Sequence, residues 1–301
     1  MDERKALDAK ASGLMIILCM IWGLQQVILK MAAPDITPLM QIALRSGLAA
    51  VLLLPLLYLD KASQLFNRQN LKAGGLVAFL FSLEFFLLAQ ALQWTSASHA
   101  VVLLYTAPIF VALGLHWKLP SERLSLLQWG GIAIAFLGIV VTFIRGQPAA
   151  SAPEQQMLWG DLLALAASIA WAATTITVRL SSLAQAAVTQ TLFYQLAGSF
   201  VLLSGLAIML GQASIHFTPL VIGSLAFHTL IVSFASFLVW FWLLRNYLAS
   251  RLGVFSFLTP LFGMAFGVGL LGEHIELNFV IGSALVLLGI VVVSLQGWIK
   301  K

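Results

Sequence analysis

The sequence predicts an all-α integral membrane protein with ten transmembrane helices, arranged as two inverted five-helix repeats. Three observations lead to this fold class. Of the 301 residues, 61% are hydrophobic and only 9% are charged, whereas about a quarter of the residues in a soluble globular protein are charged. The apolar residues gather into runs of roughly 20, the length that crosses a bilayer as a helix. The second half of the chain also repeats features of the first half, as many transporters do.

Composition also excludes several classes of function. The single cysteine, Cys19, permits no internal disulfide, and the five histidines show no ligand-like spacing, so we expect no metal and no cofactor. The net charge of +5 comes from basic residues that stand singly between apolar runs, which argues against a nucleic-acid partner. No Walker-type phosphate loop, kinase signature or serine elbow is present, so we expect neither ATP-driven transport nor an enzyme.

Ten apolar segments are long enough to span the membrane. The first extends to about Met31 and is not followed by a small-residue cleavage pattern, so we interpret it as a membrane helix and not as a signal peptide. The expected spans are residues 12–31, 37–59, 71–92, 98–118, 124–144, 158–178, 187–210, 219–243, 251–271 and 277–297.

The basic residues indicate the orientation of these spans. If the N-terminus is inside, the outer segments hold only Lys30 and Arg145, and the cytoplasmic segments hold thirteen basic residues. These are Arg4, Lys5, Lys10, Lys61, Arg68, Lys72, Lys118, Arg123, Arg179, Arg245, Arg251, Lys300 and Lys301. This positive-inside bias places both termini in the cytoplasm and supports an even number of spans. The expected location is the inner membrane, as a multi-pass protein. The longest outer connection, from Arg145 to Met157, is rich in Pro, Ala and Gln and is interpreted as the linker between halves.

The repeat divides the chain into a first unit at residues 1–147 and a second at residues 157–301. Gly138-Ile139-Val140-Val141 returns as Gly289-Ile290-Val291-Val292. Further matched pairs are Trp22 and Trp171, Lys30 and Arg179, Gln41 and Gln190, Pro108 and Pro260, Glu122 and Glu273, and Gly131 and Gly282. With five spans per unit, the second unit starts on the opposite side of the membrane, so the repeats are inverted and a substrate site is expected where they meet.

These features resemble the EamA-type members of the drug/metabolite transporter superfamily, over nearly the whole chain. The first-half features are Ile21-Trp22-Gly23, Leu44-Arg45, the segment from Ser98 to Pro108, Ser121-Glu122-Arg123-Leu124 and the run from Gly131 to Gly138. The second-half features are Trp171, the segment from Ser250 to Pro260, Gly272-Glu273 and the run from Gly282 to Gly289. The resemblance implies a ten-helix inverted-repeat fold, with a cavity lined mainly by spans 1, 3, 4, 6, 8 and 9.

Glu84 has the highest expected free-energy cost of burial in the membrane, because it lies within the third span between apolar neighbours. A carboxylate there must be paired, protonated or facing water. Glu84 and Arg45 each lie eight residues from an outer span end, so the two could form an ion pair at one depth. The alternative is that Glu84 faces a cavity, where it binds a substrate amine or takes up a proton.

Other intramembrane residues are candidates for the substrate site. His228 is either a gating or proton-coupling group or a neutral histidine bonded to a neighbouring helix. Gln25 and Gln26 point about 100° apart, so only one of them faces a cavity squarely. The symmetry mates Trp22 and Trp171 form aromatic walls or fill space, and Tyr105 is a further cavity candidate. His99, at the outer mouth of the fourth span, is expected to contact water.

Two prolines and two pairs of small residues suggest how the helices bend and pack. Pro108 and Pro260 remove backbone hydrogen bonds in symmetry-related spans, so they are hinge candidates for alternating access, although static kinks fit the sequence equally well. Gly263 with Gly267, and Gly131 with Ala135, are interpreted as sites of close helix packing.

We therefore expect a secondary transporter, an exporter of small organic metabolites such as amino acids, either coupled to protons or uncoupled. Its expected partners are a small-molecule substrate and the lipid bilayer, and we expect a monomer or a weak homodimer. The alternatives are efflux of drugs or purine-like bases, or a non-transporting intramembrane enzyme or structural protein.

Overall fold

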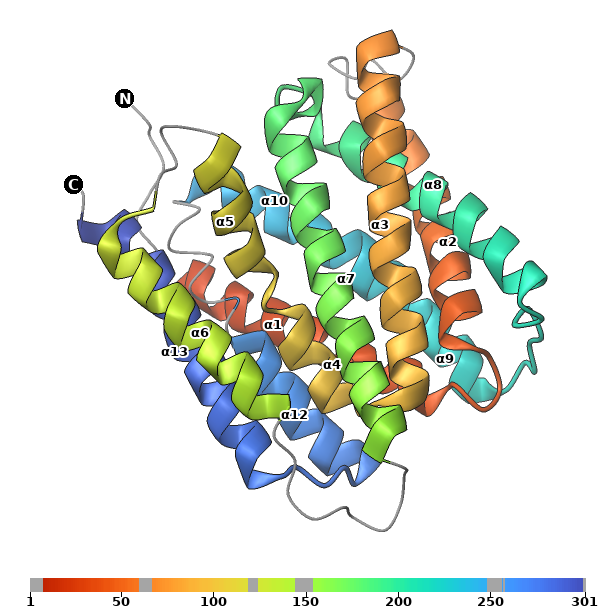
Figure 1. Cartoon of the computed structure of the whole chain (residues 1–301). Coiled ribbons are helices and arrows are strands. Elements are labelled where there is room, and N and C mark those ends of the chain that lie inside the picture. Colours follow the sequence, from red (N-terminus) through yellow and green to blue (C-terminus); the bar gives the residue numbers. More distant parts are fainter. Residues whose placement is uncertain are drawn as a thin grey trace.

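The computed structural model describes residues 8–59, 67–118, 124–143, 154–247, 256 and 258–299, and this part of the chain is helical apart from short connections. Figure 1 shows the helices packed as a bundle. In chain order they are α1 (Ala9–Met31), α2 (Pro38–Leu59), α3 (Arg68–Trp94), α4 (Ala97–Leu104), α5 (Ala107–Lys118), α6 (Leu126–Phe143), α7 (Glu154–Leu180), η2 (Ser182–Ala184), α8 (Val188–Met209), α9 (Pro219–Ala226), η3 (Phe227–Ser236), α10 (Phe237–Asn246), α12 (Leu258–Leu271) and α13 (Leu277–Ile299).

The expectation of an all-α membrane protein is confirmed for the described residues. Seven helical segments are long and apolar enough to cross a membrane, and three shorter apolar helices accompany them. The shorter ones, at residues 126–142, 258–271 and 277–292, also fall within expected spans. The helix α7 begins at Glu154, four residues before the expected span, which shortens the linker between the halves.

One expected span is broken in the middle. The helix α4 ends at Leu104 and α5 begins at Ala107, with a turn at Tyr105 and Thr106 between them. The proline ring of Pro108 would clash with the carbonyl group four residues earlier, which is that of Leu104, so an unbroken helix is disfavoured at this point. The two parts of the span are therefore separate rods that meet at a turn.

A second expected span changes its hydrogen-bonding register. Between α9 and α10, the ten residues of η3 form a π-helix. Such stretches are rare and are frequently found at functional sites. His228 is the second residue of this stretch, and Ser236 is the last.

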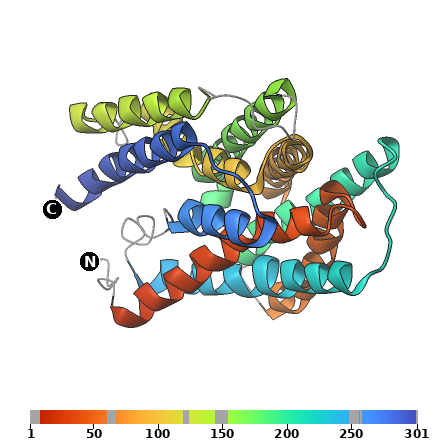
Figure 2. The same ribbon diagram turned by 90° about the horizontal axis from the view of Figure 1, so that it is seen from below.

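The helices α6 and α13 lie side by side, as Figure 2 shows, and their glycines lie at the contact. A Cβ atom on Gly138 would lie 2.6 Å from the Gly282 carbonyl oxygen, and one on Gly289 would lie 2.6 Å from the Ala135 backbone nitrogen. The copies of the repeated glycine motif thus bring two backbones together. This packing agrees with the resemblance, which does not place these two spans among those that line the cavity.

The helix α12 lies in equally close contact with α1 and α4. A Cβ on Gly23 would lie 2.8 Å from the Gly263 backbone nitrogen, and Gly263 and Gly267 face Val101 and Ser98 of α4. Small residues permit backbones to approach in this way inside a membrane. The close packing expected at Gly263 and Gly267 is therefore present.

One end of the bundle, which we call the far end, lies opposite to the beginning of α1 and the end of α13. There α1, α3 and α12 end and α4, α7 and α13 begin, at the lower end of the view in Figure 1. The connections at this end are joined to each other. Thr218 Oγ1 donates to Asp35 Oδ2 at 3.0 Å, Thr37 Oγ1 donates to the Gln212 carbonyl oxygen at 2.7 Å, and Ile36 forms an isolated antiparallel bridge with Ile215.

Candidate functional site

Arg45 is buried on α2 but has partners. Its side chain is only 3% exposed. Nη1 donates to Gln25 Oε1 of α1 at 3.1 Å, and the guanidinium carbon lies 4.7 Å from the centre of the Phe85 ring on α3. A guanidinium over an aromatic face is held by a cation–π interaction. Its Nε atom has no hydrogen-bond partner in the described part of the chain.

Glu84, next to Phe85 on α3, is buried without such partners. Its side chain is 4% exposed, and Oε2 accepts no hydrogen bond from any described residue. Within the part of the chain that the structure describes, Glu84 and Arg45 form neither an ion pair nor a hydrogen bond, although they are close enough for their charges to interact. The two charged side chains therefore lie near each other but do not pair with each other.

Two aromatic residues and a threonine adjoin these charges. Tyr105, at the break after α4, meets Trp171 of α7 edge to face, with ring centres 5.3 Å apart and planes at 80°. Tyr105 also lies within electrostatic reach of Glu84 and beside Thr259 of α12, whose Oγ1 is buried without a hydrogen-bond partner among the described residues. We call Arg45, Glu84, Tyr105, Trp171 and Thr259 the central cluster. It draws side chains from five separate segments of the bundle.

His228 is connected to the central cluster through Gln25 and is itself buried. The ring is fully buried, with Nδ1 2.8 Å from the Ser224 carbonyl oxygen and Nε2 3.1 Å from the Gln25 carbonyl oxygen. The Ser224 hydroxyl in turn donates to Gln41 Oε1 on α2. His228 thus bonds to the backbone of the residue whose side chain holds Arg45.

Trp22 belongs to different surroundings from its repeat partner. Its Nε1 donates to Ser236 Oγ at 3.0 Å, and its ring meets Trp240 of α10 edge to face at 5.6 Å. Trp171 is therefore the member of the pair that joins the central cluster. Gln26 is fully buried, and neither of its amide atoms has a partner within the described residues.

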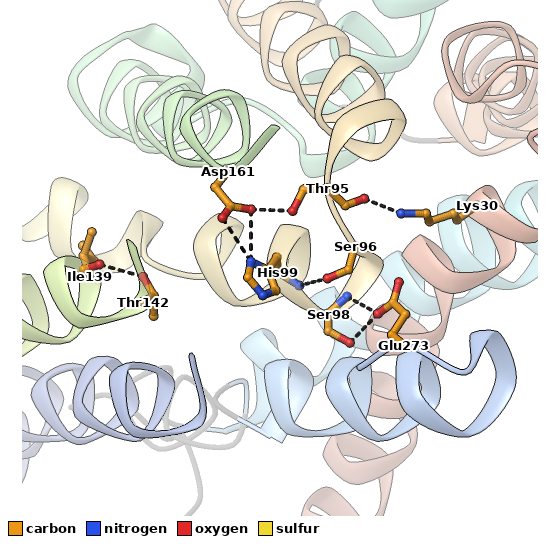
Figure 3. A network of polar contacts seen from close by, with 9 residues as sticks. All are labelled: Lys30, Thr95, Ser96, Ser98, His99, Ile139, Thr142, Asp161 and Glu273. Atoms are coloured by element: carbon orange, nitrogen blue, oxygen red, sulfur yellow. Dashed lines mark hydrogen bonds and ion pairs between the residues drawn. The ribbon is translucent and has the colours of Figure 1, made fainter. Parts of the chain in front are cut away.

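A second polar cluster lies at the far end, as Figure 3 shows. His99 of α4 is 4% exposed, so the expectation that it contacts water was wrong. Its Nδ1 lies 3.1 Å from both carboxylate oxygens of Asp161 on α7, and its ring stacks on Phe279 of α13 with centres 3.7 Å apart. Thr95 also donates to Asp161, and Lys30 Nζ donates to the Thr95 carbonyl oxygen.

Glu273 completes this far-end cluster. Its carboxylate accepts hydrogen bonds from the backbone nitrogens of Ala97 and Ser98, at 2.6 and 3.0 Å, and from Ser98 Oγ at 2.6 Å. Asp161 was not among the sequence candidates, and Glu273 was noted only for its match to Glu122 and as part of the Gly272-Glu273 feature of the resemblance. The signal for Asp161 was an acidic side chain inside an expected span, the same signal that singled out Glu84.

The hinge candidates lie in different helical settings. Pro108 is the second residue of α5, directly after the break in its span, whereas Pro260 is in the first turn of α12, where proline is tolerated. The start of the expected span at residues 251–271 lies outside the described residues, as does Ser250. The repeat partner Glu122 lies outside them too, as do the basic residues Arg4, Lys5, Lys61, Arg123, Arg145, Arg251, Lys300 and Lys301.

Comparisons with known proteins agree along the length of the chain. It is 27% identical over 276 residues to the "Uncharacterized transporter YoaV" of Bacillus subtilis (strain 168), covering 91% of this chain and 93% of that protein. It is 26% identical over 298 residues to the "Probable amino-acid metabolite efflux pump" of Salmonella typhimurium (strain LT2), covering 94% of each chain. A solved crystal structure aligns with a TM-score of 0.67 at 18% identity, over 98% of this chain and all of its own, which shows a shared fold.

The sequence pattern of the EamA-like transporter family matches residues 9–144 and matches again at residues 158–295. The apolar helices at these positions make the chain a multi-pass membrane protein. The protein belongs to the EamA-like transporter family.

Proposed function

We propose that this protein is a secondary transporter that exports small organic metabolites of the amino-acid class across the inner membrane by alternating access. The observation that carries this proposal is the central cluster, where, among the described residues, a buried carboxylate and a buried guanidinium do not pair with each other and lie near two aromatic rings. Buried charges in membrane helices are costly and usually mark a substrate or ion path. Membership of a transporter family and the name of the Salmonella relative support the same function.

The architecture that we propose is a pair of inverted five-helix repeats, at residues 1–147 and 157–301, with ten spans in all. Support comes from the two stretches matched by one family and from the seven long and three shorter apolar helices. The glycine contacts between α6 and α13, which join the last span of each half, also fit such a pairing. In this arrangement the substrate site lies between the halves.

An unpaired acid and base suit a zwitterion. An amino acid carries a carboxylate for Arg45 and an ammonium group for Glu84. Arg45 Nε and Glu84 Oε2 both lack a hydrogen-bond partner among the residues that the structure describes. The rings of Tyr105 and Trp171 offer an apolar and polarisable surface for its side chain. A bound amino acid would thus give each of the two side chains a partner of opposite charge.

Movement of protons through the site is a second part of the proposal. With no substrate bound, Glu84 needs a proton or water, because no basic side chain of a described residue pairs with it. An exchange of a proton for the substrate ammonium at this carboxylate would couple export to the proton gradient. Uncoupled facilitated diffusion would leave transport independent of a pH gradient.

Purified protein in sealed liposomes tests the function. We expect saturable exchange of a radiolabelled amino-acid mixture for the wild-type protein and loss of at least about 90% of it for Glu84→Gln, because the neutral amide cannot pair with an ammonium group. Glu84→Asp should recover part of the exchange. Glu276→Gln, which makes the same chemical change before α13, is the matched control and should transport normally.

The same preparation separates the competing functions. Competition by a purine base or an apolar organic cation, with no effect of amino acids, would replace the proposed substrate class. Chemical conversion of the labelled solutes by the detergent-solubilised protein would indicate an enzyme. Unchanged exchange in Glu84→Gln would exclude Glu84 from the site.

A further inference from the structure

The beginning of α4 is held by a carboxylate from another part of the chain. Glu273, in the connection between α12 and α13, accepts two backbone N–H groups and the Ser98 hydroxyl, all within the first two residues of α4. The first N–H groups of a helix have no partner within the helix, and the helix dipole favours an anion there. The contact therefore joins two segments that are 175 residues apart.

Glu273 is aimed at α4 by the way α12 ends. Gly272 adopts a left-handed backbone with φ of 65°, and its N–H bonds to the Val268 carbonyl oxygen at 3.1 Å, as in the αL type of helix C-cap. The Glu273 N–H bonds back to the Gly267 carbonyl oxygen at 3.2 Å. A Cβ atom at Gly267 would collide with both Ser98 Oγ and the Glu273 carboxylate. Two glycines thus provide the turn and the space that the contact needs.

A second contact holds the next residue of α4. His99 is bonded to both carboxylate oxygens of Asp161 on α7, and it stacks on Phe279 of α13. The contacts of Ser98 and His99 together attach the start of α4 to α7, to the α12–α13 connection and to α13. In Figure 3 the side chains of Ser98, His99, Asp161 and Glu273 lie together around the first turn of α4.

The other end of α4 lies at the break in its span, where the Thr106 hydroxyl donates to Ser168 Oγ of α7 at 3.0 Å. The helix has eight residues and ends at the break formed by Tyr105 and Thr106, so it is not continuous with α5. Tyr105 itself belongs to the central cluster through Trp171. One short rod therefore connects the far-end cluster to the central cluster.

We propose that α4 is a gate, and that Glu273 with Ser98 and Asp161 with His99 form the latch that keeps its far end closed. Release of the latch lets α4 swing about Tyr105–Thr106 and opens a path from the far end to the central cluster. The inference rests on the transporter function proposed above but not on the substrate, and its test does not measure transport.

The accessibility of a buried cysteine tests the gate. Val101 is fully buried on α4, one turn inward from the latch and against Gly263. In a Cys19→Ala background, which removes the only natural cysteine, Val101→Cys is labelled with a water-soluble maleimide in lipid nanodiscs. We expect Glu273→Ala to raise the labelling rate at least about tenfold, because hydrogen bonds to a charged group are lost. Ser98→Ala should raise it less, and Glu276→Ala should leave it unchanged.

A second probe distinguishes opening of the gate from loosening of the whole protein. Ser46 is buried on α2, away from the far-end cluster, and Ser46→Cys is nearly isosteric. In the Glu273→Ala protein its labelling rate should stay at the wild-type value. Equal acceleration at Val101→Cys and Ser46→Cys, or no acceleration at Val101→Cys, would overturn the latch. Loss of the proposed transport function would appear in the liposome assay and would leave these labelling rates unchanged.

Discussion

At the scale of single residues, the unequal partners of Arg45 and Glu84 lead to a test of stability. Glu84→Gln removes a buried charge that has no partner in the described part of the chain, so the melting temperature should stay the same or rise. Arg45→Gln deprives Gln25 Oε1 of its donor and Phe85 of its cation, and should cost about 1–3 kcal/mol. Thermal unfolding of the purified proteins measures both effects. Equal destabilisation by the two substitutions would indicate an ion pair instead.

Asp8 provides a prediction on pH outside the membrane spans. Its carboxylate accepts the Ala11 backbone N–H at 2.7 Å and the Tyr247 hydroxyl at 2.8 Å, and these bonds lower its pKa, the Ala11 bond most. The charged form therefore stabilises the folded state above the ordinary pKa of about 3.9, and this contribution is lost as the pH falls through the lowered value.

We expect the wild-type protein to melt above Asp8→Asn at pH 7, because asparagine still caps α1 but carries no charge. The gap in melting temperature should close as the pH falls below about 4, where the carboxylate becomes protonated. A gap that stays constant over this range would show that the charge of Asp8 does not contribute.

At the scale of the element, two glycines on α6 form a matched pair for a test of helix packing. A Cβ on Gly138 would meet the backbone of α13, while one on Gly130 would meet nothing within 4 Å. Gly138→Ala should therefore destabilise the protein by about 1–3 kcal/mol, since two backbones must separate. Gly130→Ala should be neutral or stabilise it by up to about 1 kcal/mol. Unfolding curves of the two variants decide the point.

The elements also differ in how far the sequence could predict them. The break after Leu104 follows from a steric clash with Pro108, a local effect that a reader of the sequence can anticipate. The π-helix of η3 could not be anticipated, because its residues are as apolar as their neighbours and only the choice of hydrogen-bond partner distinguishes it. The composition of the sequence thus predicted where the span lies but not the π-helical hydrogen-bonding pattern within it.

At the scale of the whole molecule, the distribution of lysine and arginine predicts the orientation. Green fluorescent protein fused after Lys301 should fluoresce, because the C-terminus is expected in the cytoplasm. Alkaline phosphatase at the same position should be inactive, and alkaline phosphatase inserted after Pro148, in the expected outer linker, should be active. The reverse pattern would invert the topology and place the far-end cluster on the cytoplasmic side.

The helices were predictable because length and apolarity are local properties of the chain, whereas the site was predictable only in part. Glu84, Tyr105 and Trp171 were candidates, and the structure brings them together. The depth argument placed Arg45 near Glu84 but could not show that Arg45 turns to Gln25. The contact between His99 and Asp161 joins positions 62 residues apart, and no local pattern records such a partner.

The contact between Glu273 and α4 also has a consequence for biosynthesis. Ser98 emerges from the ribosome 175 residues before its partner, which corresponds to roughly 10–35 s at about 5–20 residues per second. During this interval the first amide groups of α4 have no carboxylate to bind, although the helix has already been made. The N-terminal half is therefore synthesised without this contact. The start of α4 can gain its carboxylate partner only after α12 and Glu273 have been made.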